Sequence, residues 1–194
     1  SISSGYILLY AHFLQANSGS FIKSSQTFSI YDWVNSEADR VENGVFNFHG
    51  TLDASGIAKI FAKATTVRVN KMFGSSVYIT GKSVTLGFDY KDNPVVGKVG
   101  IPTGKVVITS FGNLIQKVGV KIVGKNITLY SAGDMKLKDN IDAYSTGVNE
   151  VSFIPTSSGG IAFYVSTPGV VVPGKIRLAG GGSLIVGQAS DITA

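Results

Sequence analysis

The sequence predicts an all-β protein, a β-sandwich or jelly-roll with an extended N-terminal arm and at most one short helix. Charged residues make up only 15% of the 194 residues, and glycine is frequent, with 24 copies. Strong helix formers are few, whereas Val, Ile, Thr, Ser, Tyr and Phe are plentiful, which favours strands and tight turns. Short apolar segments between Gly- and Pro-containing breaks then recur along the chain, as in sandwiches and jelly-rolls.

The domain organisation expected from these features is an N-terminal strand and linker over residues 1–20, followed by one β-sandwich domain over residues 21–194. Residues 6–14 form a short strand pattern that is apolar at both parities, so both of its faces need cover. The stretch Asn17–Ser20 is a flexible break after it. Leaving this strand in water would expose about eight large side chains and cost on the order of 10 kcal/mol.

The following elements are expected in chain order. Residues 21–31 form a second extended segment, and residues 32–44 form a short helix that Asp32 caps and Gly44 ends. Residues 60–69 are ambiguous between helix and strand, and we favour a strand. No exact repeat is visible that would indicate a solenoid. Further strands are expected at residues 76–90, 95–101, 105–110, 114–123, 126–131, 134–138, 148–154, 161–166, 170–178 and 183–188.

No residue pattern in the chain indicates catalysis, so the protein is not expected to be an enzyme. Cysteine is absent, which excludes thiol chemistry and zinc–thiolate sites. The segment Thr80–Ser83 resembles the end of a phosphate-binding loop, but Ser76 stands where that motif needs glycine. The two histidines, His12 and His49, lie in apolar strand patterns, and no Gly-x-Ser-x-Gly motif accompanies them.

Charge and acidic residues give no cofactor site either. The net charge is +5, but the lysines are dispersed, which favours a role in solubility and edge protection over nucleic-acid binding. Turn-borne carboxylates could supply oxygen ligands for calcium, although they also suit ordinary turns and match no calcium-loop motif. We therefore expect no cofactor and no metal. These acidic positions are Asp89, Asp92 with Asn93, Asp134, and Asp139 to Asp142.

Several features favour an extracellular location. No apolar run approaches 18 residues, so no membrane span is expected. The sequence begins without Met, which suggests a processed N-terminus. The triplet Asn126-Ile127-Thr128 is an N-glycosylation sequon after a turn, so Asn126 is the expected site of an N-linked glycan.

The apolar opening strand suggests assembly. It could be the first strand of its own sheet, or it could insert into the next subunit and complete that subunit's sheet. The second arrangement is a head-to-tail contact, which propagates into a homopolymer. The expected donor-strand residues are Tyr6, Ile7, Leu8, Leu9, Tyr10, Phe13 and Leu14.

With these features, the chain resembles the secreted β-sandwich subunits of archaeal surface threads and of TasA-like bundling pili. The resemblance rests on the apolar segment Tyr6 to Leu14, the Cys-free Gly- and Val-rich strands, the low charge and the Asn126 sequon. It implies a glycosylated, non-enzymatic subunit of a filament at the cell surface. A virion coat or surface-layer jelly-roll protein is one alternative, and a secreted monomeric carbohydrate-binding module is another.

Overall fold

The structure is a computed structural model that describes residues 1–33, 44–89, 91, 93, 95–139, 141–143, 149–155, 161–163, 174–178 and 184–186. The side chains considered below lie within residues 1–139. Most described residues lie in strands, and none of them lies in a helix. The strands are β1 (Ile2–Ala11), β2 (Phe13–Ala16), β3 (Phe21–Asp32), β4 (Gly44–Ala54), β5 (Ile57–Phe73), β6 (Ser76–Leu86), β7 (Gly97–Val99), β8 (Lys105–Ser110), β9 (Leu114–Gln116), β10 (Val120–Gly124), β11 (Asn126–Ser131), β12 (Met135–Leu137), β13 (Ile141–Ala143), β14 (Asn149–Pro155), β15 (Ile161–Phe163), β16 (Gly174–Leu178) and β17 (Leu184–Val186).

All strand pairings in the described part of the chain are parallel. They form three parallel sheets, which we call faces, and we call each turn of the chain around these faces a coil. The first face runs β1-β3-β5-β6-β8-β11-β14-β16. The second runs β2-β4-β5-β6-β9-β12-β15-β17. The third begins with the start of β1, which pairs with the start of β3, and then continues through β4, β5, β7, β10 and β13.

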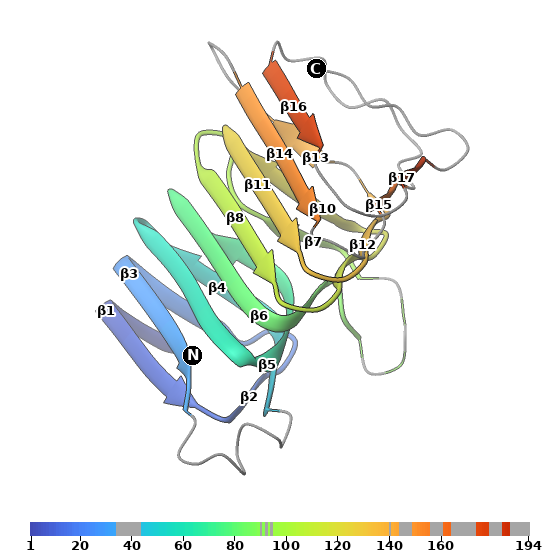
Figure 1. The fold of residues 1–194 in the computed structure, drawn as a ribbon. Helices are drawn as coiled ribbons and strands as arrows, with labels where there is room; N and C mark the ends of the chain where they lie inside the picture. The colour runs from blue at the N-terminus through green and yellow to red at the C-terminus, as the bar shows by residue number, and fades with distance from the viewer. Residues whose placement is uncertain are drawn as a thin grey trace.

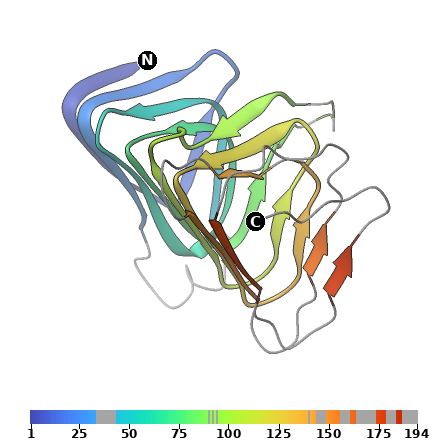
Figure 2. The same cartoon turned by 90° about the horizontal axis from the view of Figure 1, so that it is seen from above.

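The chain therefore winds as a three-sided parallel β-helix. Figure 1 shows successive strands stacked in chain order from the N-terminal to the C-terminal part, and Figure 2 shows the chain circling a common interior. The long strand β5 bends through all three faces, with a register shift between Ala62 and Thr66 where it turns from the first face to the second. Each described coil between the first and the last thus pairs with the coils before and after it.

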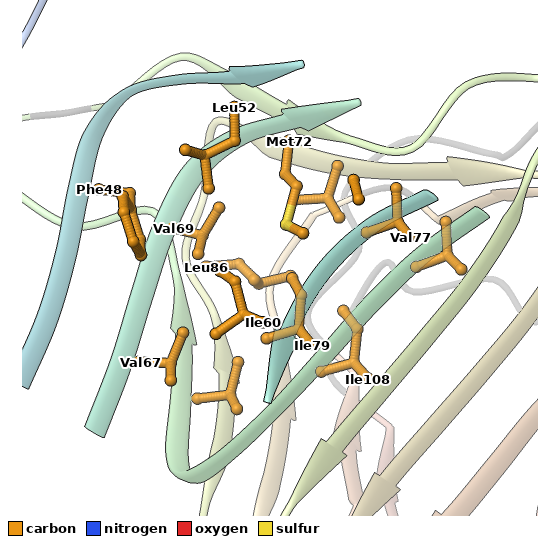
Figure 3. Packing of buried hydrophobic residues seen from close by; sticks show 14 of the residues in the cluster. Phe48, Leu52, Ile60, Val67, Val69, Met72, Val77, Ile79, Leu86 and Ile108 are labelled. Atoms are coloured by element: carbon orange, nitrogen blue, oxygen red, sulfur yellow. The ribbon is translucent and has the colours of Figure 1, made fainter. Parts of the chain in front are cut away.

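The core consists of rows of inward side chains that continue from one strand to the next. In the first face, Ile30, Ile60, Ile79 and Ile108 occupy successive positions of one row, and all are fully buried. Figure 3 shows three of these isoleucines beside residues of the other faces, such as Val67 and Met72. At about 1.5–3 kcal/mol for each large side chain buried, these rows are the main stabilising contribution along the axis.

The corner between the first and second faces is held by serines. Ser110 and Ser131 end the strands β8 and β11 in the same register position, and both are fully buried. The Ser110 hydroxyl donates to the Asn113 carbonyl at 2.8 Å, and the Ser131 hydroxyl donates to the Gly112 carbonyl at 2.7 Å. Backbone groups that the turn removes from the sheet are therefore partnered inside the corner.

The β-sandwich or jelly-roll expected from the sequence is wrong, because those folds need antiparallel pairing and these strands pair in parallel. The absence of a visible repeat was also misleading. The equivalent inward residues Phe28, Ala58, Val77, Val106 and Ile127 are separated by 30, 19, 29 and 21 residues, so the unequal spacing hides the period.

Three local expectations have different outcomes. The strand expected over residues 60–69 lies within β5, and that expected over 21–31 matches β3. The helix expected over 32–44 falls mostly on residues 34–43, which lie outside the described residues. Residues 1–20, expected as an arm, contain β1 and β2, which pair with β3 and β4 of the same chain.

Candidate functional site

The residues that could suggest catalysis do not converge in the structure. His12 lies between β1 and β2, where its ring meets the Phe13 ring edge-on at 4.5 Å between centroids. His49 is on β4 and packs 5.1 Å from the Phe88 ring centroid. The segment Thr80–Ser83 is continuous strand within β6, so it lacks the strand–loop–helix order of a phosphate-binding loop.

The acidic turn residues serve local structure where they are described. The backbone N–H of Lys91 donates to Asp89 Oδ1 at 2.8 Å, and this bond, together with the Asn93 side chain, lowers the pKa of the Asp89 carboxyl group. Asp139 accepts a hydrogen bond from the Gly119 backbone N–H. Among the described residues, no group of three or more His, Asp or Glu side chains could hold a metal ion. Asp92 and Asn140 lie outside those residues.

The strand β1 is the candidate site for which the structure provides the most evidence. It pairs with β3, with Ile7 opposite Phe28 and Leu9 opposite Ile30. Ile7 is buried, whereas the inward residues Leu9 and Leu14 are only partly buried against the core. They belong to the first coil, which has a neighbouring coil on one side only within the described chain. The inner face of β1 is therefore covered in part.

The outward residues of the same coil remain exposed. Tyr6 is 70% exposed, Leu8 59%, Tyr10 54% and Phe13 64%. The sequence-based donor residues thus divide into an inward set and an outward set by strand parity. Large apolar side chains gathered on one part of a surface are typical of interaction sites.

The edge of β1 that faces away from β3 has no strand beside it in the described part of the chain. The Ala11 carbonyl accepts a hydrogen bond from the Trp33 N–H at 2.7 Å, so Ala11 directs its backbone groups toward the end of β3. Successive residues of a strand direct these groups to alternate edges, so Leu8 and Tyr10 direct theirs to the open edge. An edge of this kind is a template for another strand.

An aromatic row on the outer side of the first face was not identified from the sequence. Tyr10 stacks on Tyr31 with centroids 5.3 Å apart, and Tyr31 lies 6.1 Å from Phe61. Lys59 Nζ lies 5.2 Å from the Tyr31 ring centroid and donates to the Tyr31 hydroxyl at 3.3 Å. The Tyr10 and Tyr31 rings are stacked and the Phe61 ring is tilted against Tyr31, so these contacts strengthen the packing of β1 on β3 and of β3 on β5.

A second feature missed in the sequence is a column of lysines on the outer side of the third face. Lys71 of β5 pairs with Lys98 of β7, which pairs with Lys121 of β10. All three side chains are exposed. We call these three residues the lysine column. They are separated by 27 and 23 residues in the chain, so only the strand register brings them together.

Asn126, the expected glycosylation site, is the first residue of β11 and is exposed. Its neighbour Ile127 points inward and is fully buried, which leaves Asn126 and Thr128 on the outer side of the first face. The asparagine is therefore on an accessible surface.

Comparison with protein-family models, with curated proteins and with solved structures found no match in any of the three. The structure has no helix, among the residues it describes, with the length and apolar character needed to cross a membrane.

Proposed function

We propose that this chain is a non-enzymatic structural subunit of an extracellular filament, and that its copies join head to tail through the open edge of β1. The observation that carries the proposal is the state of the first coil. Its strand has one edge without a partner in the described chain, inward residues that are only partly covered, and exposed outward residues at Tyr6, Leu8 and Tyr10.

The fold supplies a geometrical reason for polymerisation. Every described pairing is parallel, so β1 and β16, each of which pairs with one strand in the described part of the chain, run in the same direction. The first face begins with β1 and reaches β16, which pairs with β14 alone in the described part of the chain. A strand of a second copy can therefore add to β1 and extend the rows of Ile7 and Leu9. Such a contact is heterologous and does not close, so it propagates.

The joint proposed here differs from the insertion first expected. The sequence suggested that β1 leaves its own globule and fills a groove in a neighbouring sandwich. In the revised mechanism β1 stays paired with β3 and offers its second edge. The resemblance to archaeal threads and TasA-like pili stays a prediction about function, since those subunits are β-sandwiches. The extracellular location and a glycan on the exposed Asn126 are part of the same proposal.

The test is to block the edge without disturbing the coil. Leu8→Pro removes an N–H that points to the open edge and leaves the backbone groups directed at β3 in place, because proline is tolerated at sheet edges. We expect filaments of the 194-residue chain by electron microscopy, and their loss in Leu8→Pro with unchanged far-ultraviolet circular dichroism.

A matched control is Tyr78→Thr, which changes an outward residue of the same row on β6, in the interior of the sheet. This variant is expected to assemble like the parent. Monomers from the parent chain at all accessible concentrations would contradict the proposal, as would filaments of Leu8→Pro that are indistinguishable from those of the parent.

A further inference from the structure

The lysine column presents repeated positive charge along the axis of the β-helix. Met72, Val99 and Ile122 point inward and are fully buried, so the preceding residues Lys71, Lys98 and Lys121 point outward. Their strands are adjacent and in register. Neighbouring strands lie about 4.8 Å apart, so the three side chains start from points about that far apart along the axis.

This arrangement is unfavourable without a counter-charge. Like charges directly opposite one another in a sheet are destabilising. In the described part of the chain, none of the three ammonium groups has an ion pair; Lys98 Nζ lies 5.4 Å from the Phe73 ring centroid. Thr51, which pairs with Lys71 on β4, adds no carboxylate to the column. Among the described residues, Asp53 of β4 carries a carboxylate but pairs with Phe73 and not with a lysine of the column.

Other lysines of the molecule also contact aromatic rings. Lys59 and Lys63 lie over the Phe61 ring at 5.3 and 5.2 Å, and Lys105 lies 5.7 Å from the Tyr78 centroid. Lys98 makes the same kind of contact with Phe73. What distinguishes the lysine column is that its three members occupy adjacent positions of the strand register.

We propose that the lysine column binds an acidic polysaccharide that lies along the axis of the β-helix, with one carboxylate for each lysine. A linear polysaccharide that carries a carboxylate on every sugar presents a regular series of negative charges, which complements the regular series of lysines. The chain then crosses β5, β7 and β10 at right angles and neutralises the three ammonium groups in turn.

Nucleic acid fits this surface less well. Single-stranded nucleic acids are held by aromatic platforms on which successive bases stack. The Phe73 ring beside the column is half-buried and lies under Lys98, so it offers no open face for a base to stack on.

The test uses polygalacturonate oligomers as the probe and titration calorimetry as the measurement. We expect binding that weakens as salt rises. Lys98→Gln should lower the affinity about two- to fivefold, as for the loss of one exposed ion pair. Lys59→Gln is the matched control on the first face and should leave the affinity unchanged. Neutral dextran should not bind.

Charge reversal separates binding from folding. Lys98→Glu places a carboxylate between Lys71 and Lys121, so the melting temperature should rise above that of the parent while polygalacturonate binding is lost. Retained polygalacturonate binding in Lys98→Glu would overturn the proposal, and a melting temperature below that of the parent would contradict the repulsion between the lysines on which it rests. Single-stranded DNA that binds more tightly than polygalacturonate at equal salt would also overturn it, as would equal losses in Lys98→Gln and Lys59→Gln. None of these outcomes depends on filament formation.

Discussion

The row of inward residues that contains Leu9, Ile30 and Ile60 gives the sharpest test of how the first coil is covered. Ile60 lies on β5 between two neighbouring strands and is fully buried, whereas Leu9 lies on the end strand β1 and is half-buried. Both residues occupy the same register position. Truncating each residue to alanine therefore removes a similar side chain from a fully buried position and from a half-buried one.

The magnitudes follow from burial. Ile60→Ala leaves a cavity between packed coils and should lower the free energy of unfolding by about 2–5 kcal/mol. A fully buried leucine contributes about 1.5–3 kcal/mol, so the half-covered Leu9 contributes about half of that, and Leu9→Ala should cost about 1 kcal/mol in the unassembled chain. In a filament a second copy covers Leu9, and the same truncation should then raise the critical concentration for assembly about fivefold to tenfold.

Two assays read these quantities separately. Urea unfolding followed by circular dichroism, at a concentration below assembly, gives the free energy of the single chain. Sedimentation of assembled material gives the critical concentration. The reasoning is refuted if Leu9→Ala lowers the free energy of unfolding of the unassembled chain as much as Ile60→Ala does. Leu9 would then be fully buried within its own chain. An unchanged critical concentration in Leu9→Ala would refute it as well.

Three further predictions concern corners and surface groups. Gly100 has φ of 91°, and a Cβ there would collide with the Val123 carbonyl, so Gly100→Ala should lower the urea midpoint strongly, whereas no change would contradict the observed corner. The pKa of Asp89 is lowered, chiefly by the Lys91 N–H, so this turn gains stability at pH values above the pKa of the unfolded chain and loses it as pH falls through the folded value. A titration of the Asp89 carboxyl by NMR should therefore have its midpoint below 3.8, and a midpoint above that value would exclude the bond. In protein from a glycosylating source, Asn126→Gln should remove one glycan mass, and an unmodified parent chain would contradict the glycan.

Much of the strand structure was predictable because alternation is a local property. β8 and β11 have the bounds that the sequence indicated, since Val106 and Ile108 alternate with Val107 and Thr109 between clear turns. Alternation, however, is the same for parallel and antiparallel neighbours. Nothing within residues 105–110 states that the neighbours are β6 and β11, so the direction of pairing could not be read from the segment.

The repeat was hidden by unequal coil lengths and permissive core chemistry. The described residues between β6 and β7 extend one corner, where Asn70 Oδ1 accepts a hydrogen bond from the Phe88 N–H at 2.7 Å and the Asn70 side-chain amide donates to the Phe88 carbonyl at 2.9 Å. An inward position needs only an apolar side chain of suitable size, so Ala58, Val77 and Ile127 occupy equivalent places without forming a recognisable motif. The lysine column escaped notice for the same reason, because its members align only once the register is known.

The first strand shows why correct residues can support the wrong architecture. The sequence identified Tyr6 to Leu14 as too apolar to be left in water, and parity explains that composition in the structure, where Ile7 and Leu9 point inward while Leu8 and Tyr10 point outward. In a sandwich, such a strand needs a groove with two walls. In a parallel β-helix the same composition suits an end coil, because an end coil has a partner on one edge and can receive an identical kind of partner on the other. Tyr10 stacked on Tyr31 shows how the outward side chains of such a pair pack along the axis. The large apolar surface of β1 is therefore better explained by a further strand that adds to its open edge than by insertion of β1 into the sheet of another subunit.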